Sequence, residues 1–269
     1  MPHPIERLRW VARAEGAGPS LLVREAAGAL ASIGDDLPGL VTGCRRLIDR
    51  HPTIGPMWWL GGRVLASNDP VSEAYAAAND LDADPTSQVL AASLPDEVTV
   101  TILGWPEQAG DALRRRGDLE VLVVDARGEG SPFARRLSTS GVDAYEVPEA
   151  GTGGAVKESG LVLLEASALG PTGCIAPAGS MAAAAVAAGL GVPVWVAAGV
   201  GRVLPGRLWE ALLARLDDAG DAWDAEDELV PIEWITTVVG PEGPLPAADA
   251  PKRADCPVVP ELLRWGTPI

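Results

Sequence analysis

The sequence has few cysteines and few histidines, which argues against several kinds of site. Its 269 residues include three cysteines, Cys44, Cys174 and Cys256, which lie far apart and form no CxxC pair. They predict neither a disulfide framework nor a zinc site, and they fit a reducing, cytoplasmic compartment. The two histidines, His3 and His51, are too few for the usual metal-ligand spacings. We therefore expect no bound metal.

Positively charged residues are scarce as well. Lys and Arg total 21 against 37 Asp and Glu, so the formal charge is −16. A protein that clamps nucleic acid needs a basic face, and an acidic surface repels anionic lipid headgroups. The composition therefore predicts neither a nucleic-acid partner nor attachment to a membrane.

Long hydrophobic runs are absent except between Met181 and Val200. That stretch is long enough to cross a bilayer, but a Gly-x-Gly-x-Pro run interrupts its second half. It predicts a buried Ala-rich helix over Gly179–Gly189, followed by a buried strand over Val192–Ala198. The first ten residues include charged side chains and no long apolar run, so we expect no signal peptide.

The sequence does contain enough apolar side chains for a packed core, with 47% hydrophobic residues. Up to about residue 95, apolar residues recur at three- and four-residue spacing, which predicts helices. The predicted helices are Ile5–Ala14, Ser20–Ser32 with Ser20 as its N-cap, Leu37–Asp49 capped by Asp36, Pro52–Leu65 and Pro70–Asn79.

After residue 97, short apolar runs alternate with helical segments. The predicted strands are Val98–Leu103, Val121–Val124, Ala144–Val147, Leu161–Leu164, Val192–Ala198 and Trp234–Val239. The predicted helices are Gln108–Arg116, Phe133–Ser140, Gly179–Gly189 and Leu208–Leu216. Two further segments, Asp217–Glu228 and Pro241–Pro257, are predicted to be a solvated acidic stretch and a surface loop.

This alternation is typical of a parallel sheet covered on both faces by helices. We therefore predict an α/β fold with an N-terminal helical domain over residues 1–95 and a C-terminal Rossmann-like domain over residues 96–269. Ligands of such sheets bind where the strands end, so the loops after Leu103, Val124, Leu164 and Ala197 are the expected site.

Several short motifs occur in a recognisable order. Leu161–Leu169 reads LVLLEASAL, Gly179–Ser180 precedes the Ala-rich helix, and Gly191–Ala198 reads GVPVWVAA. Arg50–Thr53 reads RHPT, and Asp125–Arg127 reads DAR. In this order the motifs resemble the translation initiation factor 2B α/β/δ family, which includes methylthioribose-1-phosphate isomerase and ribose-1,5-bisphosphate isomerase. Its corresponding patterns are G-A-D-A, N-K-I-G-T, G-V-P-F-Y-V-A-A, R-P-T and E-S-R-P.

The resemblance also shows what this chain lacks. In the isomerases of that family a Cys and an Asp move the protons of the sugar, which needs two titratable groups beside the substrate. The Asp corresponds to Ser167 and the Cys belongs in Leu103–Pro106, so both groups are missing. Glu15 replaces an Arg that contacts phosphate, and Ala176 and Pro177 lie near the expected N-K pair. We therefore expect no isomerase activity of the standard kind.

Some ligand contacts are expected to remain. The resemblance implies a phosphorylated sugar or nucleotide as ligand, with contacts from Gly16, Gly18, Arg127, Ser167, Gly179, Ser180 and Arg202. Trp105 follows the first strand and would fill the vacated pocket. Gly151–Gly154 matches neither GxGxxG nor the P-loop pattern, so we expect no nucleotide cofactor.

Three functions stay open at this stage. The first is a non-catalytic protein that binds a ligand as a regulator or acts as an assembly module, associating as a homodimer through its C-terminal domain. The second is an enzyme that uses Glu165 and Asp125 instead, although an ion pair between Glu165 and an arginine is the favoured alternative. For Arg202, contact with an anionic ligand and a position in a surface loop are equally favoured alternatives. The third is a subunit in translation initiation, for which fold analogy is a weak argument.

Overall fold

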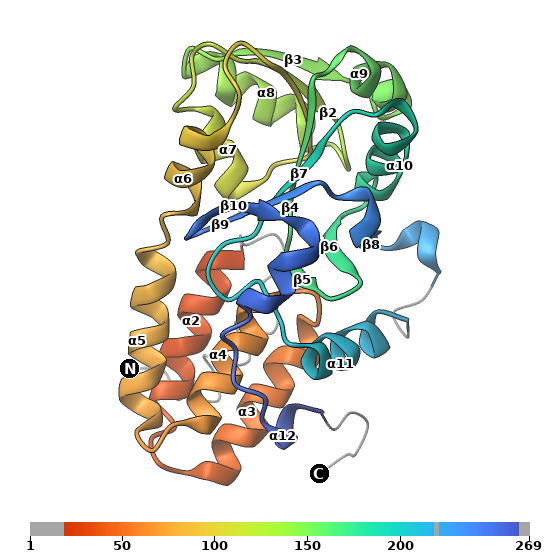
Figure 1. Cartoon of the computed structure of the whole chain (residues 1–269). Helices are drawn as coiled ribbons and strands as arrows, with labels where there is room; N and C mark the ends of the chain where they lie inside the picture. The colour runs from red at the N-terminus through yellow and green to blue at the C-terminus, as the bar shows by residue number, and fades with distance from the viewer. Residues whose placement is uncertain (1–18, 218–220, 264–269) are drawn as a thin grey trace.

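A helical bundle forms one half of the computed structural model, which describes residues 19–217 and 221–263 (Figure 1). Its helices are α2 (Pro19–Ala31), α3 (Leu37–Arg50), α4 (Gly55–Ala66) and α5 (Pro70–Asp82). The helix predicted over residues 5–14 lies outside the described residues. The predicted Ser20 cap was wrong, because Ser20 lies inside α2. Asp36 is the N-cap residue of α3, as predicted, but its side chain makes no hydrogen bond to the helix.

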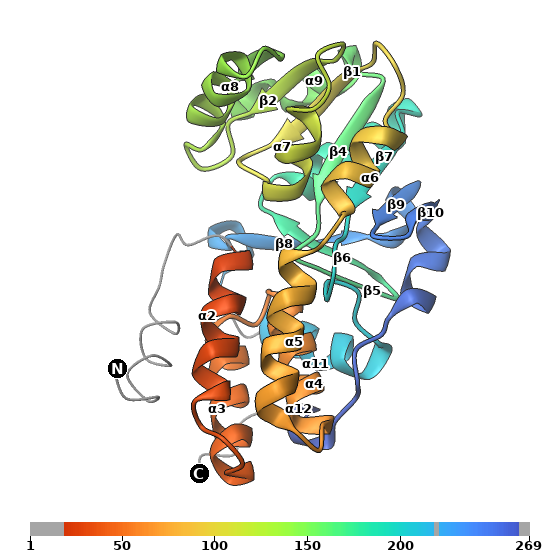
Figure 2. The ribbon, with the colours of Figure 1, turned by 90° about the vertical axis from the view of Figure 1, so that its left-hand side faces the viewer.

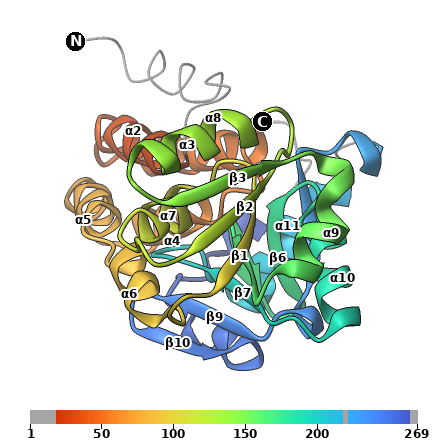
Figure 3. The ribbon, with the colours of Figure 1, turned by 90° about the horizontal axis from the view of Figure 1, so that it is seen from above.

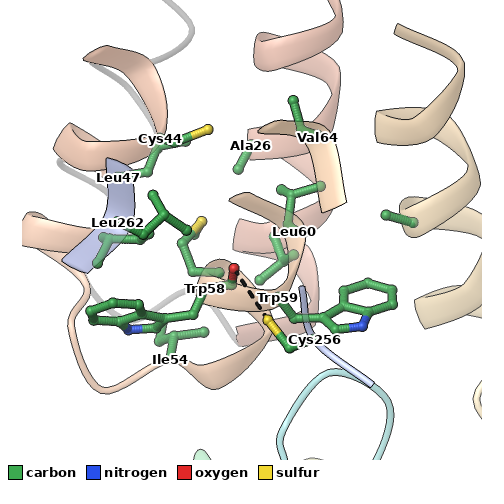
Figure 4. Close-up of a cluster of buried hydrophobic side chains, with 14 of the residues drawn as sticks. Ala26, Cys44, Leu47, Ile54, Trp58, Trp59, Leu60, Val64, Cys256 and Leu262 are labelled. Carbon is green, nitrogen blue, oxygen red and sulfur yellow. Dashed lines mark hydrogen bonds between the residues drawn. The ribbon is translucent and has the colours of Figure 1, made fainter. Parts of the chain in front are cut away.

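Tryptophan side chains dominate the core of the bundle. Trp58 and Trp59 are fully buried, and the Trp58 indole N–H donates to the carbonyl oxygen of Pro52 at 2.9 Å. Cys256 and Leu262 from the end of the chain pack against the same cluster (Figure 4). The chain thus returns to the bundle twice, through α11 (Gly206–Asp217) before the last strands of the sheet and through α12 (Pro260–Leu263) after them.

A seven-stranded sheet forms the other half, above the bundle in Figure 2. Its order is β10-β9-β7-β4-β1-β2-β3, and every pairing is parallel except that of β10 with β9. The strands are β1 (Thr99–Leu103), β2 (Glu120–Val124), β3 (Asp143–Val147), β4 (Leu161–Glu165), β7 (Val194–Ala197), β9 (Thr237–Gly240) and β10 (Gly243–Pro246). The predicted α/β class is confirmed.

Alternate residues of the sheet point to opposite layers of helices, as the two-residue period of a strand requires. Ile102 and Leu163 pack with α6, α7 and α8, whereas Leu103 and Leu164 pack with α9 and α10. Figure 3 shows α6 and α7 on one side of the sheet, and α9 and α10 on the other. These helices are α6 (Thr86–Ser93), α7 (Glu107–Leu113), α8 (Gly130–Thr139), α9 (Thr152–Glu158) and α10 (Ser180–Leu190). None of the helices in the described part of the chain is long and apolar enough to span a membrane.

A second sheet of three strands was not predicted. It pairs β5 (Ala168–Gly170), β6 (Gly173–Pro177) and β8 (Asp227–Pro231) in antiparallel fashion. The predicted solvated stretch Asp217–Glu228 therefore ends inside a strand. The predicted strand over residues 234–239 begins only at Thr237, and the predicted loop Pro241–Pro257 contains β10 and the 3₁₀ helix Ala247–Arg253.

Candidate functional site

The strands of the large sheet end at the boundary with the bundle. The strand order reverses between β1 and β4, because β2 and β3 lie beyond β1 while β7 and β9 lie beyond β4. A reversal of this kind leaves a crevice at the carboxyl ends of the two strands. The carbonyl oxygen of Ser167 accepts a hydrogen bond from the Gly55 N–H at 2.8 Å, so helix α4 begins directly against this edge.

Glu165 forms a buried ion pair with Arg202 at the end of β4. Its Oε1 lies 2.9 Å from Arg202 Nη1, and the two side chains are 9% and 4% exposed. Its Oε2 accepts the N–H of Ala109 at 2.9 Å, while Arg202 also donates to the Ala166 carbonyl oxygen at 2.5 Å. Both carboxylate oxygens have donors, so Glu165 is not a free base. Arg202 is neither a surface residue nor open to an external anion.

Asp84, in the segment between α5 and α6, makes a second polar junction beside this pair. Its Oδ2 accepts from Gln108 Nε2 at 2.6 Å and from the Val200 N–H at 2.8 Å. The Oε1 of Gln108 is buried and has no hydrogen-bond partner among the described residues. It lies next to a void of about 10 Å³ that Arg202 also lines. This void is large enough for at most one water molecule, so it is no substrate pocket.

Asp125 and Arg127 follow β2 and are also paired within the chain. Asp125 Oδ1 accepts the Gly130 N–H at 2.7 Å, at the start of α8. The Arg127 backbone has a left-handed φ of 58°, and its Nη2 lies 2.7 Å from Oε1 of Glu226. Both members of this second pair are exposed, so it contributes little to stability.

The start of α10 is a third part of the site. Gly179 precedes the helix with a φ of +95°, a conformation that a side chain would disfavour. The Met181 N–H donates to Oε1 of Glu228 at 2.6 Å. The hydroxyl of Ser180, a residue only 1% exposed, has no hydrogen-bond partner among the described residues. The Ser167 hydroxyl instead donates to the Ile175 carbonyl oxygen at 3.2 Å.

The acidic residues at the start of β8, Asp227 and Glu228, are partly buried beside the site, whereas the sequence predicted a solvated segment here. Burial raises the pKa of Asp227, against the effect of a hydrogen bond from the Thr53 hydroxyl. Burial also raises the pKa of Glu228, against the effect of the Met181 and Gly179 N–H groups. Sequence reasoning missed both residues, and the only signal was the short apolar run after them, Leu229–Val230.

The three cysteines are buried. Burial raises the pKa of each thiol, Cys44, Cys174 and Cys256, to about 12, so all three are un-ionised at neutral pH. Trp105 does not fill a pocket. It is 40% exposed and lies on the outer side of Phe133, at 5.5 Å between ring centroids.

Gly16 and Gly18 lie outside the described residues, as does Glu15. His51 is the C-cap residue of α3. Across residues 19–217 and 221–263, no three or more His, Cys, Asp or Glu side chains group together as metal ligands. A shallow hollow of about 400 Å³ lies between α8 and β3, lined by Ser131, Ala134, Arg135, Ser138, Thr139, Ala144 and Glu146.

Comparison with known proteins identifies the fold of this chain but no closer relationship to any of them. No protein-family profile and no curated protein matches the chain. A solved translation initiation factor eIF-2B of Pyrococcus horikoshii is similar over 91% of this chain and 98% of its own, with a TM-score of 0.75 and 15% identity. eIF2B beta of Chaetomium thermophilum is similar over 96% and 92%, with a TM-score of 0.74 and 13% identity.

A third similar chain comes from the tetrameric eIF2B-beta2-delta2 complex of C. thermophilum. It covers 93% of this chain and 92% of its own, with a TM-score of 0.74 and 14% identity. The identities are low, so these comparisons establish the fold. The chain has the fold of initiation factor 2B subunits over nearly its whole length.

Proposed function

We propose that this protein is a non-catalytic assembly module with the initiation factor 2B fold. One observation carries the proposal: the carboxylates and arginines at the carboxyl ends of the strands are paired inside the chain. Glu165 pairs with Arg202, Asp125 accepts a backbone N–H of α8, and Arg127 pairs with Glu226. Acid–base catalysis needs a titratable group within reach of a substrate proton, and these groups already have partners.

Assembly is supported by the similar structures. One of the similar chains belongs to a tetrameric complex, and we propose that this chain likewise associates, as a homodimer through its C-terminal half. The proposed location is the cytoplasm. Participation in translation initiation rests on the fold alone and is the lesser candidate.

Two measurements test the proposal. Sedimentation velocity over a range of concentrations should show a reversible species of twice the monomer mass. Hydrogen exchange should be compared at high and low protein concentration. On dilution, backbone amides after residue 96 should exchange faster, whereas the exchange rates of amides in α2–α5 should not change. A chain that stays monomeric at every concentration contradicts the assembly proposal.

Catalysis is tested separately. Ribose phosphates incubated with the protein should show no isomer by NMR. Turnover would contradict the proposal. If turnover occurs, turnover that survives in the Glu165→Gln variant rules out Glu165 as the base.

A further inference from the structure

The two edges of the large sheet differ in how their backbone groups are protected. Figure 3 shows β10 and β3 at opposite edges of the sheet. β10 reads GPLP, and its two prolines have no N–H group to offer to another strand. β3 reads DAYEV and contains neither proline nor lysine, the residues that commonly protect an edge strand. One edge is therefore blocked by its sequence, whereas the other can accept a further strand.

The pairing of β3 with β2 shows which backbone groups are open. The Val147 carbonyl oxygen accepts the Asp125 N–H at 2.8 Å, so the backbone of Val147 faces β2. Successive residues of a strand direct their backbone groups to opposite sides, so Ala144 and Glu146 direct theirs away from β2. Among the described residues, the Ser138 hydroxyl reaches the Ala144 carbonyl oxygen at 3.4 Å, which is a long and weak hydrogen bond. The N–H groups of Ala144 and Glu146 have no hydrogen-bond partner in that part of the chain.

The shallow hollow between α8 and β3 lies beside these open groups. It measures about 400 Å³, and Ala144 and Glu146 line it together with residues of α8. Every second side chain of an added strand would point into this hollow. Ala134, Ala144 and Ser138 in its lining leave room for a small apolar side chain. The Arg135 guanidinium, also in the lining, is held at 2.8 Å by a serine hydroxyl of α8.

The charge around β3 indicates the kind of strand that fits. Asp143, Glu146 and Glu149 are exposed acidic residues in and just after β3. Tyr145, on the face of the sheet opposite the hollow, is 52% exposed. Hydrogen bonding to Asp143 and the charges of Asp143 and Glu120 raise the pKa of Tyr145, so its ring lies among carboxylates. An aromatic ring among carboxylates is a favourable place for a lysine or arginine side chain.

We propose that β3 is a docking edge for an extended segment of a partner protein in which basic residues alternate with small apolar residues. The segment adds a strand to the sheet, with its basic side chains beside Tyr145 and Asp143 and its apolar side chains in the hollow. A second copy of this chain fits the edge less well, because it would place acidic side chains opposite acidic side chains. The inference goes beyond the proposed assembly and does not depend on it.

The first test uses the full-length chain and a short capped peptide in which lysine alternates with valine. A peptide in which glutamate alternates with valine is the reference. Titration calorimetry should show saturable binding of the lysine peptide and no binding of the glutamate peptide. By NMR, the amides of Ala144 and Glu146 should exchange rapidly with solvent in the free protein and slowly in the complex. Absence of saturable binding, or binding without protection of these two amides, overturns the proposal.

Variants separate backbone pairing from charge. Glu146→Pro removes an outward N–H group as well as the charge, whereas Glu146→Gln removes the charge alone. The proline variant should bind the lysine peptide about tenfold more weakly than the glutamine variant. Glu210→Gln removes an exposed acidic residue of α11, which lies far from β3 (Figure 1), and should bind like wild type. Equal binding by the two Glu146 variants would show that the peptide does not pair with the backbone of β3.

A further variant keeps the test decisive if Glu146→Pro does not fold. Glu146→Lys retains the backbone N–H and places a positive charge at the edge, so it should lose most of the binding of the lysine peptide. Unchanged binding by this variant would overturn the proposal. Sedimentation velocity identifies the other possible occupant. Conversion of a wild-type dimer to monomer by Glu146→Pro would show that a second copy of the chain, and not a basic segment, occupies this edge.

Discussion

The three thiols show how strongly burial decides the chemistry of single residues in this fold. Cys44, Cys174 and Cys256 are at most 6% exposed, and their pKa values are raised to about 12. The thiolate is the reactive form of cysteine, and almost none is present at neutral pH. All three therefore lack the ionised thiol that a catalytic cysteine requires.

We predict that the native thiols resist modification. A thiol-specific reagent such as DTNB should label essentially none of the three cysteines in the folded protein at pH 7.5 and all three in denaturant. Absorbance of the released thiolate measures the number of reacted groups. Rapid labelling of one cysteine in the native state would contradict its burial, and mass spectrometry of the labelled peptides would identify it.

A second residue-scale prediction concerns Asp227. Because its pKa is raised above the usual 3.8, the folded state binds a proton more readily than the unfolded chain. The free energy of unfolding should therefore increase as pH falls from neutrality toward 3.8. Asp227→Asn removes the cost of burying a charge and keeps an oxygen that accepts from Thr53. It should stabilise the protein at pH 7, and the gain should shrink at lower pH.

Urea unfolding at several pH values measures this effect. Asp224→Asn is the matched control, because Asp224 is an exposed residue of the same acidic stretch and its substitution should change stability by less than about 0.5 kcal/mol. A destabilised Asp227→Asn protein at pH 7 would show that the ionised form is favoured in the fold.

Among the elements, the contact between β5 and α11 leaves no room for a side chain on β5. A Cβ on Gly170 would lie 2.1 Å from the Trp209 ring. That ring is 1% exposed, and its indole N–H donates to the Thr172 hydroxyl at 2.8 Å. The glycine is thus needed for close packing of a strand on a helix, and sequence patterning alone does not reveal that need.

We predict opposite effects for two Gly→Ala substitutions. Gly170→Ala should destabilise the protein by about 1–3 kcal/mol, because the tryptophan must move out of its packed position. Gly153→Ala, in α9 where nothing lies within 4 Å of the new Cβ, should stabilise it by about 0.5–1 kcal/mol. Thermal and urea unfolding compare the two variants with wild type. A neutral Gly170→Ala would show that Trp209 repacks without cost.

The local sequence of β8 explains why this strand was not predicted. Its sequence, DELVP, begins with two acidic residues and has no alternation of polar and apolar side chains. As an edge strand that pairs only with β6, it needs few apolar side chains of its own. Its two acidic side chains instead contact Thr53 and the start of α10, and Glu226 just before the strand contacts Arg127.

Over the whole molecule, Asp84 joins the bundle to the sheet. It lies between α5 and α6, and its carboxylate accepts hydrogen bonds from Thr86, from Gln108 of α7 and from Val200 after β7. The two halves therefore share a polar network as well as the core around Trp58 and Trp59. We expect the halves to unfold together.

Substitution of Asp84 should test this coupling. Asp84→Ala leaves several donors at the boundary without an acceptor, and we predict a loss of about 2–4 kcal/mol in the free energy of unfolding. Asp82→Ala, two residues away, breaks only the exposed pair with Arg24 and should cost less than about 1 kcal/mol. Circular dichroism and tryptophan fluorescence should give coincident transitions in wild type and separate ones in Asp84→Ala. Coincident transitions in the variant would show that the core alone couples the halves.

The sequence by itself determined the α/β class, the helices of the bundle and most strands of the large sheet, because these follow from local periodicity and turn residues. It also predicted the loss of the isomerase residues, through the order of short motifs. The tertiary structure alone decided whether the charged side chains of the site are free or paired. Whether Glu165, Arg202 or Arg127 is free depends on partners from 37 to 99 residues away along the chain, and local patterns carry no information about such pairs.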